Sequence, residues 1–99
     1  MHIITHSRLL AFSEKYPDTQ TALDAWYRIM KKVRLTDFSE LRRIFPSADL
    51  VGKCVVFNIG GNKIRLIAAI HYNKGRVYIR QILTHAEYSK DQWKRECDK

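Results

Sequence analysis

Several classes of protein are excluded by what this 99-residue sequence lacks. Its two cysteines, Cys54 and Cys97, are too few for a disulfide scaffold and do not have the spacing of a metal site. We therefore expect Cys54 to be a small core residue and Cys97 to lie in a frayed tail. No apolar run approaches a membrane span, and the N-terminus lacks the basic leader of a signal peptide. These absences predict a single domain, residues 1–99, in a reducing cytoplasm and without a membrane.

Acidic residues are also scarce in one long stretch. None occurs between Asp49 and Glu87, whereas this stretch contains six basic residues: Lys53, Lys63, Arg65, Lys74, Arg76 and Arg80. The formal net charge of the chain is +8. A positive field concentrated in one part of a small fold indicates a polyanion partner, although a solvated basic surface or an acidic protein partner would also fit.

The first half of the chain has the periodicity of helices. After a short possible strand, His2–Thr5, we expect a helix from about Ser7 to Tyr16 that Pro17 ends. Asp18 or Thr19 then caps a second helix, whose apolar stripe is Leu23, Trp26, Tyr27, Met30 and Val33. A third helix, Phe38 to Ile44, follows Asp37, with Glu40 in the position of a capping box.

The second half has the period of strands. Three runs rich in Val, Ile, Phe and Tyr are separated by short connections that contain Gly and Asn, which predicts an antiparallel meander of strands 53–59, 63–70 and 76–83. Because side chains alternate across a strand, Ile64 and Leu66 share a buried face, and Arg65 points to the other. That other face could hold Arg65 and Arg80 on neighbouring strands.

The stretch "THAEY", Thr84 to Tyr88, opens the last predicted helix, which runs to about Arg95. Thr84 and Glu87 have the spacing of a capping box, and His85 and Tyr88 are three residues apart on one helical face. Trp93 packs this helix against the sheet or forms part of a partner surface. The element order is then β-α-α-β-β-β-α, an α+β fold with helices packed on one face of an antiparallel sheet.

Several segments in register resemble the HigB toxins of bacterial type II toxin–antitoxin systems, in the RelE-like superfamily. They are "DAWYRIMKK", Asp24 to Lys32, "FPSADLVGKCVVFNIGGNKIRLIAAI", Phe45 to Ile70, and "VYIRQILTHAEY", Val77 to Tyr88. The resemblance implies a RelE-like fold and an mRNA interferase that acts on messenger RNA at the ribosome. It also implies a HigA-type antitoxin with a helix-turn-helix domain. The toxin itself would contact operator DNA only indirectly, through this antitoxin.

Carried over to this chain, the resemblance assigns catalytic positions to Arg65, His85 and Tyr88, with Arg80 as an addition. Residues expected to contact RNA are Lys63, Asn58, Arg76 and Lys53. No cofactor is implied. The sequence also has no cluster of His, Cys and carboxylates that reads as a metal site, which favours attack by the ribose 2′-OH without a metal.

These residue types suit that chemistry. Histidine can accept or donate a proton near neutral pH, so His85 could be the general base or the general acid. Arginine has a planar fork that matches phosphate oxygens, and no acidic residue on the predicted strands competes for Arg65. Two other functions stay open from the residues alone: a non-catalytic RNA- or ribosome-binding module, and a protein-interaction domain that docks an acidic partner.

Overall fold

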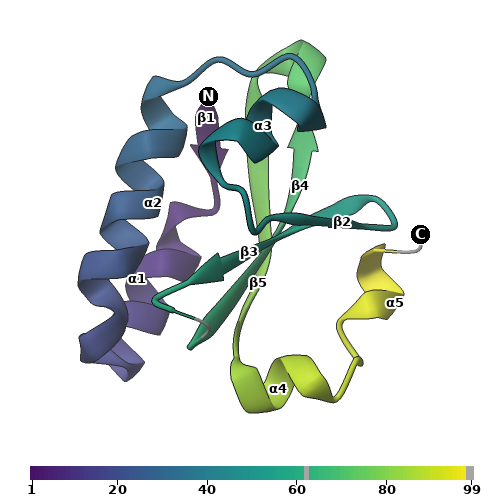
Figure 1. Cartoon of the computed structure of the whole chain (residues 1–99). Coiled ribbons are helices and arrows are strands. Elements are labelled where there is room, and N and C mark those ends of the chain that lie inside the picture. The colour runs from purple at the N-terminus through teal and green to yellow at the C-terminus, as the bar shows by residue number, and fades with distance from the viewer. Residues whose placement is uncertain (62, 98–99) are drawn as a thin grey trace.

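The computed structural model describes residues 1–61 and 63–97. A five-stranded sheet has the order β1-β5-β4-β3-β2, and helices cover it (Figure 1). The strands are β1 (His2–Ile4), β2 (Asp49–Val51), β3 (Cys54–Ile59), β4 (Ile64–His71) and β5 (Arg76–Thr84). The helices are α1 (His6–Lys15), α2 (Gln20–Lys32), α3 (Phe38–Ile44), α4 (His85–Ser89) and α5 (Lys94–Cys97). The predicted α+β class is confirmed.

The meander is antiparallel as predicted, but the whole sheet is mixed. β3, β4 and β5 pair antiparallel, whereas β1 pairs with β5 in parallel, with Ile3 opposite Val77. The expectation of a wholly antiparallel sheet was wrong at this edge, because β1 reaches β5 only through a crossover of more than half the chain. β2, which forms a hairpin with β3, was not predicted.

The main core lies between one face of the sheet and helices α1, α2 and α3. The stripe on α2 is buried as predicted, with Leu23 at 1%, Trp26 at 3% and Met30 at 0% exposure. It packs with side chains from one face of the strands, such as Phe57 and Leu66. The alternation along β3 and β4 therefore decides which residues the helices cover and leaves Arg65 on the opposite face.

Helix α3 has the predicted bounds and begins with a side-chain cap. The Asp37 carboxylate accepts a hydrogen bond from the Glu40 amide at 2.9 Å. The Glu40 carboxylate accepts from the Thr36 amide at 2.7 Å and from the Thr36 hydroxyl. Glu40 therefore stabilises the approach to the helix through the residue that precedes the cap.

The end of the chain differs most from the prediction. One helix from Thr84 to Arg95 was expected, but α4 ends at Ser89 and α5 begins at Lys94. Asp91 between them has a left-handed backbone, with φ at 60°, which no continuous α-helix can contain. This turn folds α5 back onto the face of the sheet that α1, α2 and α3 leave open, beside the β2–β3 hairpin (Figure 1).

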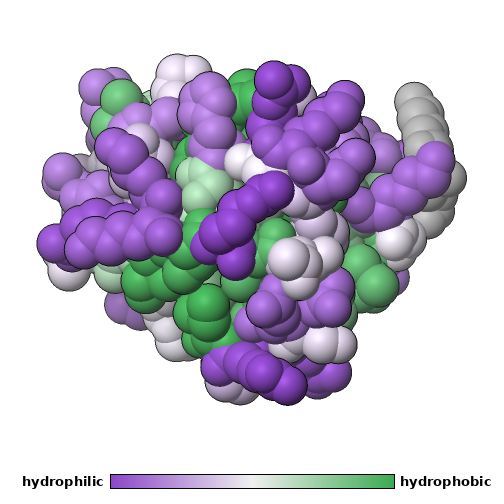
Figure 2. Space-filling view, turned by 90° about the horizontal axis from the view of Figure 1, so that it is seen from above, coloured by the Kyte–Doolittle hydropathy of each residue, from purple (hydrophilic) through white to green (hydrophobic). Residues whose placement is uncertain are grey.

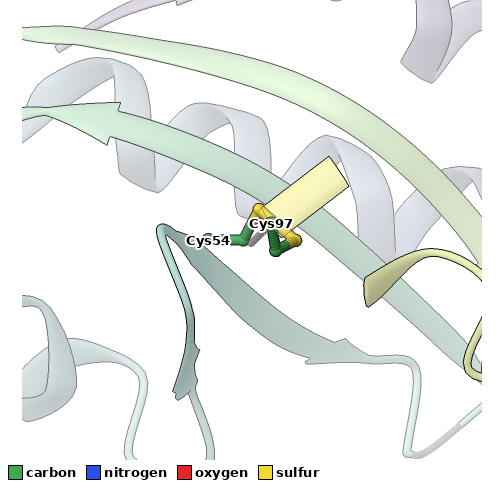
Figure 3. Close-up of a disulfide and its surroundings, with 2 residues drawn as sticks. All are labelled: Cys54 and Cys97. Carbon is green, nitrogen blue, oxygen red and sulfur yellow. A yellow bond between two sulfur atoms is a disulfide. The ribbon is translucent and has the colours of Figure 1, made fainter. Parts of the chain in front are cut away.

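A small second core fixes this segment. Cys54 is a buried core residue as predicted, whereas the expectation for Cys97 was wrong. Cys54 and Cys97 form a disulfide that joins β3 to α5 (Figure 3). Cys97 is fully buried and its carbonyl accepts a hydrogen bond from the Lys53 amide at 2.7 Å. The prediction of a frayed tail was wrong because the chain reversal at Asp91, which no sequence period shows, returns Cys97 to the sheet.

The face of the molecule seen from above is predominantly hydrophilic (Figure 2). Figure 2, seen from above the view of Figure 1, shows polar and charged side chains around a smaller hydrophobic area. Large apolar residues that stay exposed include Leu10, Ile29, Ile44 and Leu50. No helix among residues 1–61 and 63–97 combines the length and the apolar character needed to cross a membrane.

Candidate active site

The junction of β5 and α4 presents the motif that the sequence singled out. Thr84 ends β5 and caps α4: its hydroxyl accepts from the Glu87 amide at 3.3 Å. The Glu87 carboxylate accepts in return from the Thr84 amide at 3.1 Å. This is the reciprocal capping box that the Thr–Glu spacing predicts, and it sets where the first turn of α4 begins.

His85 is the first residue of α4 and is exposed to solvent. Its backbone carbonyl accepts a hydrogen bond from the Ser89 hydroxyl at 2.9 Å, so the single turn that carries the imidazole is closed by a side chain as well as by the cap. An exposed imidazole on a fixed helix start can reach a bound substrate from the protein surface.

Arg65 lies on β4, at the same end of the sheet as α4. It is opposite Asn58 on β3 and Leu83 on β5, one position from the terminal pair Ile64–Thr84. Its side chain is 9% exposed, and the centre of its guanidinium lies 5.0 Å from the ring centroid of Tyr88. A cation over an aromatic face at this separation is attracted by the ring, which orients the guanidinium.

Tyr88 is held in turn by the segment that follows α4. Its ring stacks on the indole of Trp93, with centroids 4.8 Å apart and planes 15° apart. The Trp93 Nε1–H donates to the Tyr88 carbonyl at 2.9 Å. The structure thus shows the first of the two alternatives for Trp93, packing against the sheet, and Trp93 also contacts the predicted site.

The other predicted RNA contacts divide between the two ends of the sheet. Asn58 is half-buried beside Arg65, and Lys63 is exposed in the turn that leads into β4. Arg76 pairs with His71 at the opposite end of β4, six residues from Arg65 and therefore about 20 Å along the strand. The sequence predicted one basic face, but only part of it lies beside His85.

Arg80 and Lys53 belong to a second basic region. A bulge in the pairing of β4 and β5 leaves Arg80 as an extra residue between Ile79 and Gln81. The residue opposite Arg65 is Leu83, so Arg80 is not its cross-strand neighbour. Arg80 lines a cavity of about 680 Å³ and a second of about 290 Å³. The larger is lined by Arg8, Arg80, Gln81 and Glu96, and the smaller by Lys53, Cys54, Ala69, Ile70, His71, Arg80 and Glu96.

Two residues of this second region were not predicted. Arg8 on α1 donates a hydrogen bond from its guanidinium to the Arg80 carbonyl. Glu96 on α5 lines both cavities. Neither position has a sequence signal, because each reaches Arg80 through the packing of an element far away in the chain. Among residues 1–61 and 63–97, no three His, Cys, Asp or Glu side chains form a group that could hold a metal ion.

Comparisons with known proteins point to one family. The profile of the HigB toxin family, described as the RelE-like toxic component of a toxin–antitoxin system, matches residues 19–91. The chain is 37% identical over 91 residues to the mRNA interferase toxin HigB of Escherichia coli K12, covering 89% of this chain and 88% of the relative. The same identity and coverage hold for the mRNA interferase HigB of Shigella flexneri. An mRNA interferase HigB of Escherichia coli O6:H1 is 36% identical over 93 residues, covering 91% of this chain and 90% of the relative.

Proposed function

This chain belongs to the HigB family of RelE-like toxins, the toxic components of toxin–antitoxin systems, and from that premise we propose that it is an mRNA interferase. It would cut messenger RNA as an endoribonuclease and so inhibit translation and growth. The observation that carries the proposal is the placement of the exposed His85, on a capped helix start, at the same end of the sheet as the Arg65–Tyr88 pair.

The proposed reaction is attack of the ribose 2′-OH on the adjacent phosphorus. The 2′-oxygen forms a bond to phosphorus and loses its proton to a base, while the bond from phosphorus to the 5′-oxygen breaks and an acid gives that oxygen a proton. The products are a 2′,3′-cyclic phosphate and a 5′-hydroxyl. His85 is our candidate for one of the two proton transfers, because histidine can act in either direction near neutral pH.

Arg65 is our candidate for binding the phosphate. Its guanidinium is largely withdrawn from water and oriented by Tyr88, so its charge is screened less than that of an exposed lysine. A fixed positive charge stabilises the extra negative charge of the transition state more than that of the ground state. Tyr88 would orient the substrate with its hydroxyl, and Asn58 and Lys63 would contact the neighbouring nucleotide.

Arg80, Lys53 and Arg76 would act on RNA at a distance from the scissile bond. They lie toward the other end of the same strands, as far as about 20 Å from Arg65, which is the span of several nucleotides. Contacts of basic side chains with phosphates add affinity without sequence preference, and such binding weakens as the salt concentration rises.

The partners follow from the same proposal. A toxin of this family has an antitoxin, which we propose to be of the HigA type, with a helix-turn-helix domain that reads the operator. The substrate would be messenger RNA bound to the ribosome, and the cytoplasm would be the place of action.

The test is to map the ends of messenger RNA after incubation of the purified chain with translating ribosomes. We expect new ends with the wild type, and at least a hundredfold slower cleavage with His85→Ala, which is the typical contribution of a general acid or base. His2→Ala is the matched control, because His2 is also exposed but lies on the edge strand β1. Equal cleavage by a folded His85→Ala variant would remove His85 from the mechanism.

The same experiment separates the two other functions. Salt-sensitive binding to ribosomes or RNA without new ends would identify a non-catalytic binding module. Absence of RNA binding, together with tight binding to an acidic protein segment, would identify a protein-interaction domain.

A further inference from the structure

The segment that follows α4 folds back and contacts the end of that helix. After Ser89 the left-handed Asp91 reverses the direction of the backbone, and the Asp91 amide donates to the Tyr88 carbonyl at 3.1 Å. The same carbonyl accepts from the indole of Trp93 at 2.9 Å. Two donors on one acceptor tie the end of α4 to the segment that carries Trp93.

Trp93 is also one of the least accessible residues on this face of the sheet. It is 2% exposed and packs with Cys54 and Val56 of β3 and with Ile67 of β4. The Cys54–Cys97 disulfide fastens α5 to β3 four residues after Trp93. The indole is therefore held against the sheet by its own packing, and the disulfide adds a covalent link nearby.

These contacts form a chain from the sheet to the proposed phosphate-binding group. Trp93 stacks on Tyr88 at 4.8 Å, and Tyr88 lies 5.0 Å from the Arg65 guanidinium. α4 itself has five residues, and helices that short are not stable alone. Contacts from outside the helix must therefore hold its orientation. Two of them, the ring stacking on Tyr88 and the hydrogen bond to the Tyr88 carbonyl, come from the buried Trp93.

We propose that Trp93 is a positioning residue of the nuclease site: it holds Tyr88, and through Tyr88 the Arg65 guanidinium and the start of α4 that carries His85. Trp93 is too buried to touch RNA, so its effect on the reaction passes through these residues. This inference rests on the proposed function. Trp93 itself lies just outside residues 19–91, the part of the chain that the family profile matches.

The test compares Trp93→Ala and Trp93→Phe with the wild type. In Trp93→Ala we expect kcat for messenger RNA cleavage to fall by about ten- to a hundredfold, since small displacements of catalytic groups cost that much, with KM nearly unchanged. Trp93→Phe keeps an aromatic ring that can stack on Tyr88 but loses the second ring and the N–H of the indole, so it should recover most, though not all, of kcat. If Trp93→Ala does not fold, Trp93→Leu takes its place, because it keeps an apolar side chain against the sheet but has no ring to stack on Tyr88.

Leu9→Ala is the control for lost stability alone. Leu9 is 3% exposed and lies in the main core on α1, on the opposite side of the sheet. At a temperature where both variants stay folded, this substitution should leave kcat unchanged. An equal fall in kcat for Leu9→Ala and Trp93→Ala would overturn the proposal.

Two further measurements separate this proposal from the proposed function. The double variant Arg65→Ala/Trp93→Ala should lose less activity than the product of the two single losses, because part of the effect of Trp93 passes through Arg65; fully multiplicative losses would contradict this. In NMR spectra the Nε–H of Arg65 should shift in Trp93→Ala and not in Leu9→Ala; the Tyr88 ring protons are not used, because loss of the indole ring current alone would shift them. Unchanged shifts would overturn the positioning role even if the chain proved not to be a nuclease, whereas a wild type without cleavage would overturn only the function.

Discussion

The guanidinium of Arg65 lies 5.0 Å from the ring centroid of Tyr88, and this contact joins the two halves of the proposed site. Arg65 comes from the middle strand of the sheet, whereas Tyr88 comes from the short helix after the last strand. The capping box fixes the start of that helix, so the contact fixes His85 relative to the Arg65 guanidinium.

Replacing Arg65 should separate charge from shape. We expect Arg65→Ala to lower kcat by about a hundred- to a thousandfold, as for loss of one transition-state donor, and Arg65→Lys to be intermediate because it keeps the charge but not the planar fork. Arg42→Ala removes the same charge from an exposed site on α3 and is the control. Single-turnover cleavage rates give the comparison, and a normal rate for Arg65→Ala would remove Arg65 from the site.

The cap at Thr84 should control the local stability of α4. In Thr84→Ala the Glu87 amide loses its acceptor, which typically costs about 1 kcal/mol. Amide hydrogen exchange should therefore be about fivefold faster at residues 87–90, with cleavage reduced in parallel. Thr84→Ser keeps the hydroxyl and should behave as the wild type. The role of the cap would be refuted by unchanged exchange in Thr84→Ala.

The Cys54–Cys97 disulfide should stabilise the fold by closing a loop. The cysteines are 43 residues apart, which corresponds to about 4 kcal/mol of unfolding free energy in the chain-entropy estimate. Urea unfolding of the oxidised chain should move to a lower midpoint after reduction with a dithiol. The double variant Cys54→Ser/Cys97→Ser should unfold at that lower midpoint with or without the dithiol. A midpoint that reduction does not change would show that α5 is held by packing alone.

Glu40 should give the fold a dependence on acidic pH. The hydroxyl and the amide of Thr36 both donate to its carboxylate and hold the pKa of Glu40 below its ordinary value. The folded state therefore binds this proton less readily than the unfolded state, and the stabilisation is present above the ordinary pKa. It is lost as the pH falls through the lowered pKa.

In Glu40→Gln this contribution is absent at every pH. The difference in urea midpoint between wild type and variant should therefore be largest near neutral pH and should shrink as the pH is lowered. Glu14→Gln, at an exposed position on α1, is the control. A wild-type–variant difference that stays constant with pH would contradict the proposed role of Thr36.

The sequence by itself determined the features that depend on near neighbours. The buried stripe of α2, the hairpins of the meander and the cap at Thr84 follow from side-chain periods and from residues three apart, and the structure has each of them. The alternation along β4 likewise put Arg65 on the face away from the main helices, because successive side chains of a strand point to opposite faces of the sheet.

Only the tertiary structure decided what lies beside Arg65. The parallel pairing of β1 and the packing of the segment after Asp91 depend on contacts between segments far apart in the chain, and the bulge at Arg80 arises in the pairing of two neighbouring strands. The reversal at Asp91 returns Trp93 to Tyr88 and Cys97 to Cys54. No local period records such contacts, since their free energy comes from burial against a sheet that must form first.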